Sequence, residues 1–534
     1  MKADTHHRVS PGRWRLLLAV AACLGTLSCA PTMTTDKPTS YAIEDPESTY
    51  LGQTAQAIAD GHGEESGFLL LDRGRDALAW RLIFADAAEK SIDTQVFLWK
   101  DDAAGKVMMQ RLLTAAERGV RVRVVIDDSM TDSNPQYLAL FGAHPNIEVR
   151  LYKPFGPKHK SYVLRWIEYV ADMKRLNRRM HNKLFLVDGS VAIVGGRNIG
   201  NEYFEYPGPF VNRSRDLLAL GPVAIQAAKE FDLYWNSAWT VPIEMAVAPV
   251  PQEEDVRAEM TSLDAFAADP SNYPAGFFDD PDNIDAEMAA LAEQLLWGRA
   301  TLLFDAVPGP DGKPQPIPEA DRTGFQLFQA MQKSTQEILI ESAYLIQPRD
   351  GLIALDDMGK KGVRIILVTN SMSSNNHLTA FEGYRKQRKE VLGITNVELY
   401  EIRSDFAAEA ALFTAEELKD NDTHFGLHAK TTVFDRRIVF VGSFNVDPRS
   451  INLNTEMGLL IESETLGALV ADSIEGDIAP GNSWQVILND QGKTEWLTKE
   501  NGVVTETYDK EPLTTAVQRA EAAALRIVPD TGEL

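Results

Sequence analysis

Two segments of the 534-residue chain carry the same four polar residue types at the same spacing. In each, a histidine is followed by a lysine two positions later, an aspartate seven positions later and an asparagine seventeen positions later. An isolated histidine and lysine at this spacing would be weak evidence, but a duplicated pattern argues against chance. The residues are His181, Lys183, Asp188 and Asn198 in the first segment, and His428, Lys430, Asp435 and Asn445 in the second.

These side chains suit the chemistry of a phosphate ester. Lysine and asparagine donate hydrogen bonds to non-bridging phosphate oxygens and stabilise the charge that develops there. With two histidines, one can attack phosphorus while the other protonates the leaving alcohol. No group of cysteine, histidine and acidic residues has metal-ligand spacing, because only His424 stands close to His428. We therefore expect neither a metal nor another cofactor.

The sequence around Asp188 predicts the local structure that positions the first segment. Apolar residues alternate on both sides of Asp188-Gly189, a pair that favours the positive φ angles of a tight hairpin turn. Side chains two positions apart share one face of a strand, so His181 and Lys183 should project together. Asn198 follows the return strand and should lie near the same edge. The second segment repeats this arrangement.

Helical and strand patterns alternate in both halves of the chain, which predicts an α/β protein. Gly119 and its counterpart Gly362 are 243 positions apart, and the two histidines are 247 apart. This nearly constant offset indicates that a whole domain is duplicated. In the first half we expect helices from Gly74 and around 109–116, and strands over 91–99 and 120–126. In the second half we expect a helix over 325–333, and strands over 338–345, 361–368 and 457–461.

Both segments match the pattern HxKxxxxD followed by Gly-Gly-x-Asn or Gly-Ser-x-Asn, which resembles the signature of the phospholipase D superfamily. The flanking residues LNRRMHNK in the first half and NTEMG in the second are similar to the bacterial C-type cardiolipin synthases. The resemblance covers roughly residues 65–534. It implies the phospholipase D fold, in which two pseudo-symmetric α-β-α sandwich domains share one active site.

The resemblance also implies roles for the site residues. We expect His181 to be the nucleophile and His428 the acid and base, although the near-symmetry of the motifs allows the reverse. Asp216 and Glu456 are expected to orient the histidines. For Asp188 and Asp435, a catalytic role and a role as turn former or ion-pair partner are equally compatible with the sequence. Phosphate is expected to be held by Lys183, Lys430, Asn198, Asn445 and Ser443, the last being a donor that Gly196 cannot match.

The expected reaction is phosphatidyl transfer through a phosphatidyl-histidine intermediate. A phosphatidylglycerol hydroxyl as acceptor would give cardiolipin, whereas water would make the enzyme a phospholipase D that releases phosphatidic acid. The flanking segments favour transfer. The formal net charge of −24 disfavours a nuclease of this superfamily, because proteins that bind nucleic acid usually have basic surfaces. Intact motifs disfavour a non-catalytic scaffold. The oligomeric state and any protein partner stay open.

The N-terminus predicts delivery to a membrane. Arg13 and Arg15 precede a short apolar run, and small residues lead to Cys29, as in a signal peptide with a bacterial lipobox. We expect Cys29 to carry lipid; Cys23 and an ordinary cleaved signal are the alternatives. Ala30 resembles lipoproteins sent to the outer membrane, so we expect the protein on the periplasmic side of the cell envelope. Removal of residues 1–28 makes the net charge about −27.

Two stretches stand out by their charge. Residues 158–179 are rich in Lys and Arg with interleaved aromatic residues, and could contact anionic head groups or form a solvated helix face. Residues 253–293 contain twelve acids and one basic residue, a composition that predicts a linker or surface insertion without a chemical role. The predicted division is 1–28 signal peptide, 29–65 tether, 66–250 first catalytic domain, 251–320 acidic linker or insertion, 321–475 second catalytic domain and 476–534 C-terminal extension.

Overall fold

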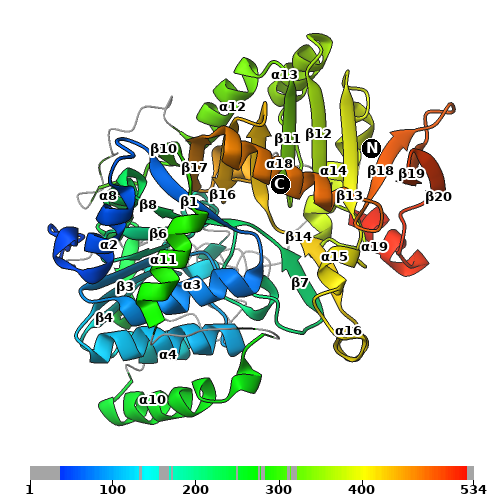
Figure 1. Ribbon diagram of the computed structural model, residues 1–534. Helices are drawn as coiled ribbons and strands as arrows, with labels where there is room; N and C mark the ends of the chain where they lie inside the picture. The colour runs from blue at the N-terminus through cyan, green and yellow to red at the C-terminus, as the bar shows by residue number, and fades with distance from the viewer. Residues whose placement is uncertain are drawn as a thin grey trace, which may run out of the picture.

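Two halves of similar construction make up the computed structural model, and they lie side by side in Figure 1. The structure describes residues 37–130, 135–155, 168–169, 172–247, 251–274, 277, 283–309, 313 and 322–525. The predicted signal peptide, Cys23, Cys29 and most of the basic stretch before Asp172 lie outside the described residues.

A mixed sheet with the strand order β9-β4-β3-β2-β5-β6-β8-β1 forms the centre of the N-terminal half. Strands β2, β3 and β4 are parallel to one another, and the other neighbours are antiparallel. The strands are β1 Ser66–Leu71, β2 Ser91–Val96, β3 Arg121–Asp127, β4 Ile147–Tyr152, β5 Leu184–Val187, β6 Val191–Gly195, β8 Asp216–Leu220 and β9 Thr240–Pro242.

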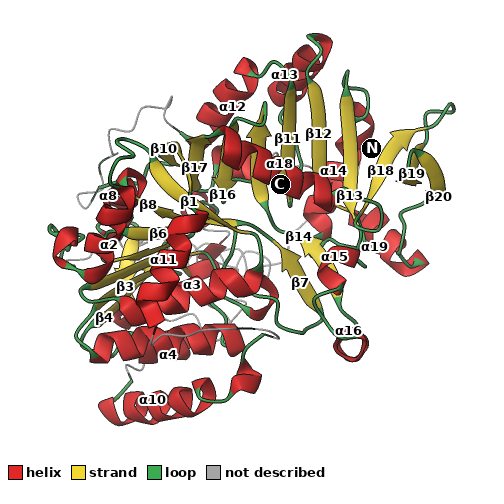
Figure 2. Ribbon diagram, in the orientation of Figure 1, coloured by secondary structure: helices red, strands yellow, loops and turns green. Residues whose placement is uncertain are grey.

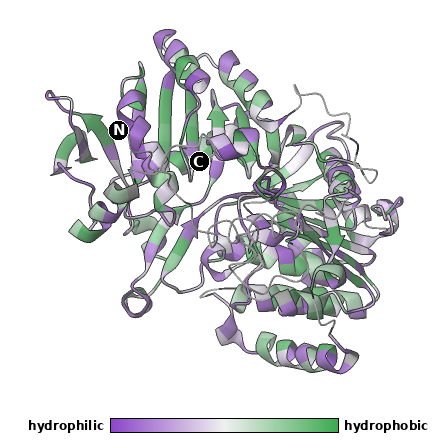
Figure 3. Cartoon of the chain, turned by 180° about the vertical axis from the view of Figure 1, so that it is seen from behind, coloured by the Kyte–Doolittle hydropathy of each residue, from purple (hydrophilic) through white to green (hydrophobic). Residues whose placement is uncertain are grey.

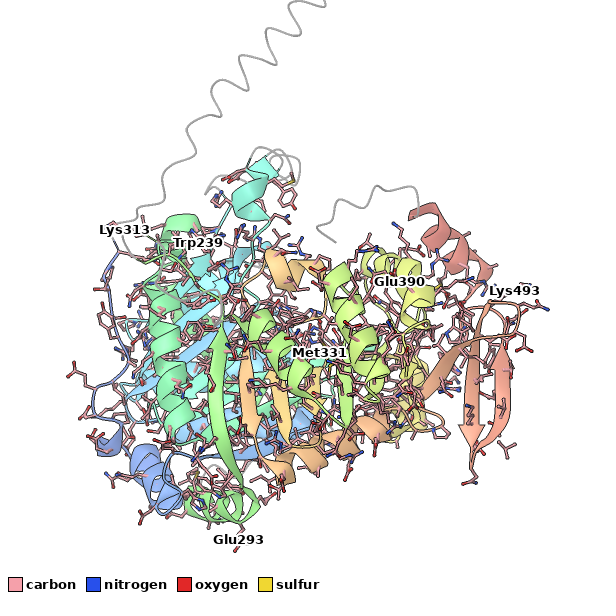
Figure 4. The ribbon with its side chains drawn as sticks, turned by 90° about the horizontal axis from the view of Figure 1, so that it is seen from above. Trp239, Glu293, Lys313, Met331, Glu390 and Lys493 are labelled. Carbon is pink, nitrogen blue, oxygen red and sulfur yellow. The ribbon has the colours of Figure 1, made fainter. Side chains whose placement is uncertain are left out.

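The C-terminal half repeats this sheet strand for strand, in the order β18-β13-β12-β11-β15-β16-β17-β10. Antiparallel pairing of β1 with β10 joins the two sheets. A further hairpin, β19 and β20, extends the outer edge of this sheet. Lys493, which immediately precedes β19, is labelled in Figure 4. The strands are β10 Leu296–Phe304, β11 Glu337–Ser342, β12 Arg364–Asn370, β13 Val397–Ile402, β15 Lys430–Phe434, β16 Ile438–Gly442, β17 Met457–Glu462, β18 Ser483–Leu488, β19 Thr494–Glu500 and β20 Val503–Tyr508.

Helices cover the sheets, so each half is layered, as Figure 2 shows. Apolar side chains concentrate on the strands, and Figure 3 shows polar residues mainly on the outer helices. The helices are α2 Tyr50–Ala59, α3 Gly74–Ala87, α4 Ala103–Glu117, α5 Pro135–Phe141, α7 Met173–Leu176, α8 Pro222–Trp235, α9 Ile243–Ala246, α10 Glu253–Ala267, α11 Ile284–Gln294, α12 Thr323–Lys333, α13 Arg349–Lys360, α14 Leu378–Val391, α15 Ala407–Ala410, α16 Ala415–Asn421, α17 Pro448–Asn452, α18 Glu464–Asp477 and α19 Ala516–Leu525.

The predicted duplication and the predicted elements are confirmed. Helix α4 ends before Gly119 and α13 before Gly362, and both glycines have positive φ, 96° and 93°. This left-handed conformation, which glycine adopts without steric cost, lets each helix turn directly into the following parallel strand. A parallel pair of short strands, β7 Phe210–Arg213 and β14 His424–Leu427, crosses between the halves next to the second motif.

Residues 37–65 depart from the tether expected over 29–65. The indole of Trp235 donates to Ser40 Oγ at 2.8 Å, and the backbone N–H of Ala42 donates to the carboxylate of Asp232 at 2.9 Å. Leu51 of α2 is fully buried. The segment folds against the N-terminal half because it supplies apolar area and satisfies buried donors there.

The segment expected to be an acidic linker also contains regular structure. Helix α10 packs on α4, and β10 occupies the place in the second sheet that β1 occupies in the first. Lys313 lies beside Trp239 in Figure 4, where the chain passes back over the N-terminal half. None of the helices in the described part of the chain has the length and apolar character needed to cross a bilayer.

Candidate active site

The two histidine segments meet at the boundary between the halves, and each is held by backbone from the other half. The backbone N–H of His181 donates to the carbonyl of Thr455 at 2.9 Å, and that of His428 donates to the carbonyl of Arg213 at 2.7 Å. His181 and His428 are each only 8% exposed. The charge of His181 contributes to the lowered pKa of His428, so the two imidazoles belong to one electrostatic site.

The motif lysines project together with the histidines, as the strand spacing predicts. Lys183 Nζ donates to the carbonyl of His181, and Lys430 Nζ to the carbonyl of His428, both at 2.6 Å. Burial lowers the pKa of Lys183 to about 7, although nearby carboxylates oppose this shift. Burial and the neighbouring Lys183 bring the pKa of Lys430 well below its ordinary value. A bound phosphate anion would restore both charges, so the site is poised to take up negative charge.

Two asparagines lie just beyond β6 and β16, where the sequence placed them. Asn198 Nδ2 donates to the hydroxyl of Tyr203 at 3.1 Å. The Oδ1 atoms of Asn198 and Asn445 are buried and have no hydrogen-bond partner among the described residues. Buried polar groups are usually paired, so these oxygens can still accept a hydrogen bond, for example from a substrate hydroxyl, whereas only the amide N–H₂ groups can donate to phosphate.

Glu456 lies where the resemblance implies, against His181. His181 Nδ1 is 2.8 Å from Glu456 Oε2 and 3.0 Å from the carbonyl of Ser443. Both partners accept, so Nδ1 carries the proton and Nε2 is left with its lone pair. Burial lowers the pKa of His181 and outweighs the opposing effect of Glu456. Burial acts to raise the pKa of Glu456, but the positive charges of His181 and Lys183 outweigh it and keep this pKa low.

Ser443 differs from the phosphate donor that the sequence suggested. Its hydroxyl donates to Glu456 Oε2 at 2.5 Å and accepts from the backbone N–H of Met457 at 3.0 Å. Ser450 Oγ donates to the other carboxylate oxygen, Oε1, at 2.7 Å. Ser443 is fully buried and committed to Glu456, so it positions the carboxylate and has no hydrogen to offer phosphate.

Asp216 also differs from its expected role. Its Oδ2 pairs with Arg81 Nη2 at 2.9 Å, and its Oδ1 accepts from the backbone N–H of Arg197 at 3.1 Å. Arg81 and Arg197 outweigh the effect of burial and lower the pKa of Asp216. No hydrogen bond joins Asp216 to either histidine in the described part of the chain.

The sheet register explains this difference. Asp216 pairs with Gly195 across β8 and β6, whereas the motif counterpart of Gly195, Gly442, pairs with Gly458. Asp216 is therefore the counterpart of Gly458, and the counterpart of Glu456 lies two residues earlier, at Ser214. Sequence comparison of the halves aligned the two acids because the register cannot be read from residue types.

The motif aspartates lie at the hairpin turns, at the far end of the strands from the histidines. Asp188 and Asp435 have positive φ, 48° and 54°, as the hairpin prediction requires. The carboxylate of Asp188 accepts from three successive backbone N–H groups, those of residues 89–91, at 2.8–3.0 Å. Asp435 does the same for residues 335–337. Both acids therefore secure the start of β2 and β11, and their position supports the role of turn former rather than a catalytic role.

Aromatic residues flank both histidines, and sequence reasoning missed them. The ring of Phe97 meets His181 edge-on with centroids 5.3 Å apart, and Tyr203 meets His428 at 5.0 Å. Ser450 was also missed as a partner of Glu456, although it stands within the segment that carries the family resemblance. Phe97 and Tyr203 have no comparable signal, because their contacts arise only when loops from separate elements meet.

Two basic side chains near the first motif, Arg179 and Lys153, are buried. Arg179 Nη1 is 3.3 Å from Asp127 Oδ1, and its guanidinium lies over the ring of Phe155. Lys153 Nζ lies 3.4 Å from the ring centroid of Trp239, and burial together with nearby arginines lowers its pKa to about 7. Both cations are therefore packed against aromatic rings in the interior.

The arrangement supplies one histidine with a free Nε2, a second histidine, two lysines and two amides around a shared position. Such a set can attack phosphorus, hold its oxygens and move a proton to a leaving oxygen. In the part of the chain that the structure describes, no group of three or more His, Cys, Asp or Glu residues is placed to hold a metal ion.

Comparison with known proteins agrees with the fold and the motifs. The family model described as "Cardiolipin synthase, PLD-like domain" matches residues 83–220 and 327–478. Cardiolipin synthase C of Escherichia coli is 34% identical over 488 residues, which cover 90% of this chain and 98% of that protein. An uncharacterised protein of Helicobacter pylori is 29% identical over 484 residues, with 90% and 91% covered.

Among solved structures, phosphatidylserine synthase of Haemophilus influenzae aligns with a TM-score of 0.50 at 14% identity, covering 80% of this chain and 90% of that one. This likeness supports the fold alone, which is the phospholipase D fold predicted from the sequence. The family model covers both motif-bearing halves, and the chain therefore belongs to the PLD-like family of cardiolipin synthases.

Proposed function

We propose that the protein is a phosphatidyltransferase of the cardiolipin synthase type. The observation that carries the proposal is the pair of histidines from opposite halves, of which His181 has Nδ1 held by Glu456 at 2.8 Å and Nε2 free. The membership of the family and the similarity to a protein named cardiolipin synthase C support the choice of a phospholipid substrate.

The first half-reaction begins with His181. Its Nε2 lone pair attacks the phosphorus of a phosphatidyl phosphodiester, and the P–O bond to the head-group alcohol breaks. The negative charge of the bound phosphodiester favours the protonated form of His428, which gives its proton to the departing alkoxide. Glu456 stabilises the positive charge that develops on the imidazole of His181. In this proposal, Lys183, Lys430, Asn198 and Asn445 hold the non-bridging oxygens.

The second half-reaction reverses the proton transfer. His428, now neutral, takes the proton of an incoming hydroxyl, whose oxygen attacks phosphorus while the P–N bond to His181 breaks. If the hydroxyl belongs to phosphatidylglycerol, the products over the whole cycle are cardiolipin and glycerol. The net protonation of the site is unchanged after one cycle, so no other proton carrier is needed.

The test is a product analysis with purified protein and vesicles of phosphatidylglycerol. We expect cardiolipin and glycerol in equal amounts, and we expect His181→Ala protein to form neither. Phosphatidic acid as the main product would show that water is the acceptor and would replace the proposal by a phospholipase D.

Activity should survive EDTA, because the two histidines supply both the nucleophile and the acid. Complete loss that is restored by zinc or magnesium would contradict this mechanism.

We further propose that lipid on Cys29 holds the protein at the periplasmic face of the bacterial outer membrane. A protein with a net charge of about −27 after signal removal is repelled by anionic bilayers, and two or three acyl chains would overcome this repulsion. Seven residues, 30–36, separate Cys29 from Lys37 in the sequence, a distance of at most about 28 Å along the chain.

Replacement of Cys29 tests the anchor. Cys29→Ser should move the protein from the membrane fraction to the soluble periplasmic fraction and lower turnover of vesicle substrate. Turnover of a short-chain soluble phosphodiester should stay nearly unchanged, which serves as the control for folding. Full retention of the variant in the membrane fraction would assign anchoring to Cys23 or to the basic stretch.

A further inference from the structure

The surroundings of the two histidines differ at two pairs of corresponding positions. Four backbone hydrogen bonds of 2.7–3.0 Å fix the correspondence between the halves. The N–H of His181 donates to the carbonyl of Thr455, and that of His428 donates to the carbonyl of Arg213. In the same way, the N–H of Ser443 donates to the carbonyl of Met457, and that of Gly196 to the carbonyl of Arg215. By this register Ser214 stands where the second half has Glu456, and Gly196 stands where it has Ser443.

This difference removes the carboxylate from His428. His428 Nδ1 and Ser214 Oγ are both buried, and neither has a hydrogen-bond partner among the described residues. The backbone of Gly196 acts to raise the pKa of His428, but burial and the neighbouring positive charges outweigh it. Ser214 lies directly against Gly196, since a Cβ at position 196 would come within 2.7 Å of Ser214 Oγ.

Three positively charged groups act on His428. Burial lowers its pKa most, and Lys430, Lys183 and His181 lower it further, to well below the ordinary value. Arg213 and Arg215, which flank Ser214, are held by Asp72 and Asp477. The ring of Tyr203 packs edge-on at 5.0 Å and carries no charge.

We propose that Ser214 is a positioning residue that keeps a carboxylate away from His428. Because His428 has no carboxylate partner, it exchanges protons with the two alcohols, and His181 attacks phosphorus. The inference rests on the proposed phosphatidyl transfer. An imidazole beside a carboxylate holds its positive charge, which suits a nucleophile that becomes cationic on phosphorylation. An imidazole without one releases its proton readily, which suits a group that must give a proton and then take one in each cycle.

The experiment compares Ser214→Glu with Ser214→Gln, which have the same shape and differ in charge. A carboxylate within about 4–6 Å favours a cation and shifts its pKa by about 1–3 units. We therefore expect the imidazole of His428, followed by nitrogen-15 NMR titration of the full chain, to titrate about 1–3 pH units higher in Ser214→Glu than in Ser214→Gln. The phosphohistidine on His181 should still form in both variants, but its transfer to alcohol should be at least about ten-fold slower in Ser214→Glu.

Two results would overturn the inference: equal His428 titration in the folded Glu and Gln variants, or a Gln variant as slow as the Glu variant. If Ser214→Glu does not fold, the wild-type protein still provides a test. His181 should then show a strongly hydrogen-bonded Nδ1 proton that His428 lacks, and two equivalent protons would overturn the inference. Failure of wild-type protein to form any phosphohistidine with phosphatidylglycerol would instead overturn the proposed function.

Discussion

The two halves share strand order and motif, yet they treat their histidines differently. In the second half, Glu456 contacts His181 and accepts hydrogen bonds from Ser443 and Ser450. In the first half, Ser214 and Gly196 occupy the corresponding positions near His428. In the mechanism proposed above, the residues that hold phosphate are of the same types in both halves. Duplication would then explain how the site holds a symmetric phosphate, and the differences at the two pairs of corresponding positions would explain how it separates a nucleophile from a proton carrier.

Replacing the histidines should have the largest effect on activity. His181→Ala and His428→Ala should each lose at least about four orders of magnitude in kcat, and the double variant should be little worse, because residues that act as a unit are not additive. Only His181→Ala should fail to form the phosphohistidine, detected as an acid-labile adduct. An adduct in His181→Ala and none in His428→Ala would exchange the roles of the two halves.

The next largest effect separates the two buried acids. Glu456→Gln should lower kcat by about 10²–10⁴-fold, because the developing charge on His181 loses its partner, with little change in unfolding free energy. Asp216→Asn should instead cost about 3–5 kcal/mol of unfolding free energy, because buried Arg81 loses its carboxylate. Urea unfolding and initial rates on the same preparations check both. A catalytic loss without a loss of stability in Asp216→Asn would restore the role expected from its sequence.

These acids also show how far the sequence alone leads. Repeated spacing predicted the duplicated α/β halves, the hairpins and the convergence of His181 with Lys183, because strand periodicity fixes which side chains share a face. It also pointed to Glu456. It could not place Ser214 opposite His428, because that contact depends on a two-residue offset in strand register between separate halves. The fold of residues 37–65 was missed because their partners, such as Asp232, are distant in sequence.

The pH dependence of activity tests the roles of the two motif lysines, Lys183 and Lys430. The pKa of Lys183 is lowered to about 7, so the free enzyme loses this charge as the pH rises above 7 and binds phosphate less well. We expect kcat/KM for a short-chain substrate to fall by up to about ten-fold per pH unit above pH 7. Lys183→Arg keeps its charge throughout this range and should flatten that decline. Lys430→Arg makes the same change in the second motif and tests the other lysine in the same way, because burial also brings the pKa of Lys430 well below its ordinary value. An unchanged decline in Lys183→Arg would contradict this assignment.

The smallest expected effect concerns the turn aspartates. Asp188 is fully buried and its carboxylate accepts three backbone N–H groups, whereas Asp435 makes the same contacts in a partly exposed position. An asparagine has one acceptor oxygen and would turn its own N–H₂ toward a backbone donor. Hydrogen bonds to a charged group are worth about 1.5–3 kcal/mol each, less where water can replace them. We expect Asp188→Asn to lower the unfolding free energy by about 2–3 kcal/mol and Asp435→Asn by about 1 kcal/mol, with kcat within about two-fold of wild type.

The pH dependence of these losses distinguishes the two turns further. Backbone N–H groups outweigh burial and lower the pKa of Asp435, so its contribution is present above its ordinary pKa and disappears as the pH falls through the lowered value. The difference between wild type and Asp435→Asn should therefore shrink below about pH 4. Burial raises the pKa of Asp188, so its contribution is retained at low pH and declines as the pH rises. The difference for Asp188→Asn should not shrink in acid. A hundred-fold loss of kcat in either variant with unchanged unfolding would show instead that the motif aspartates act in catalysis.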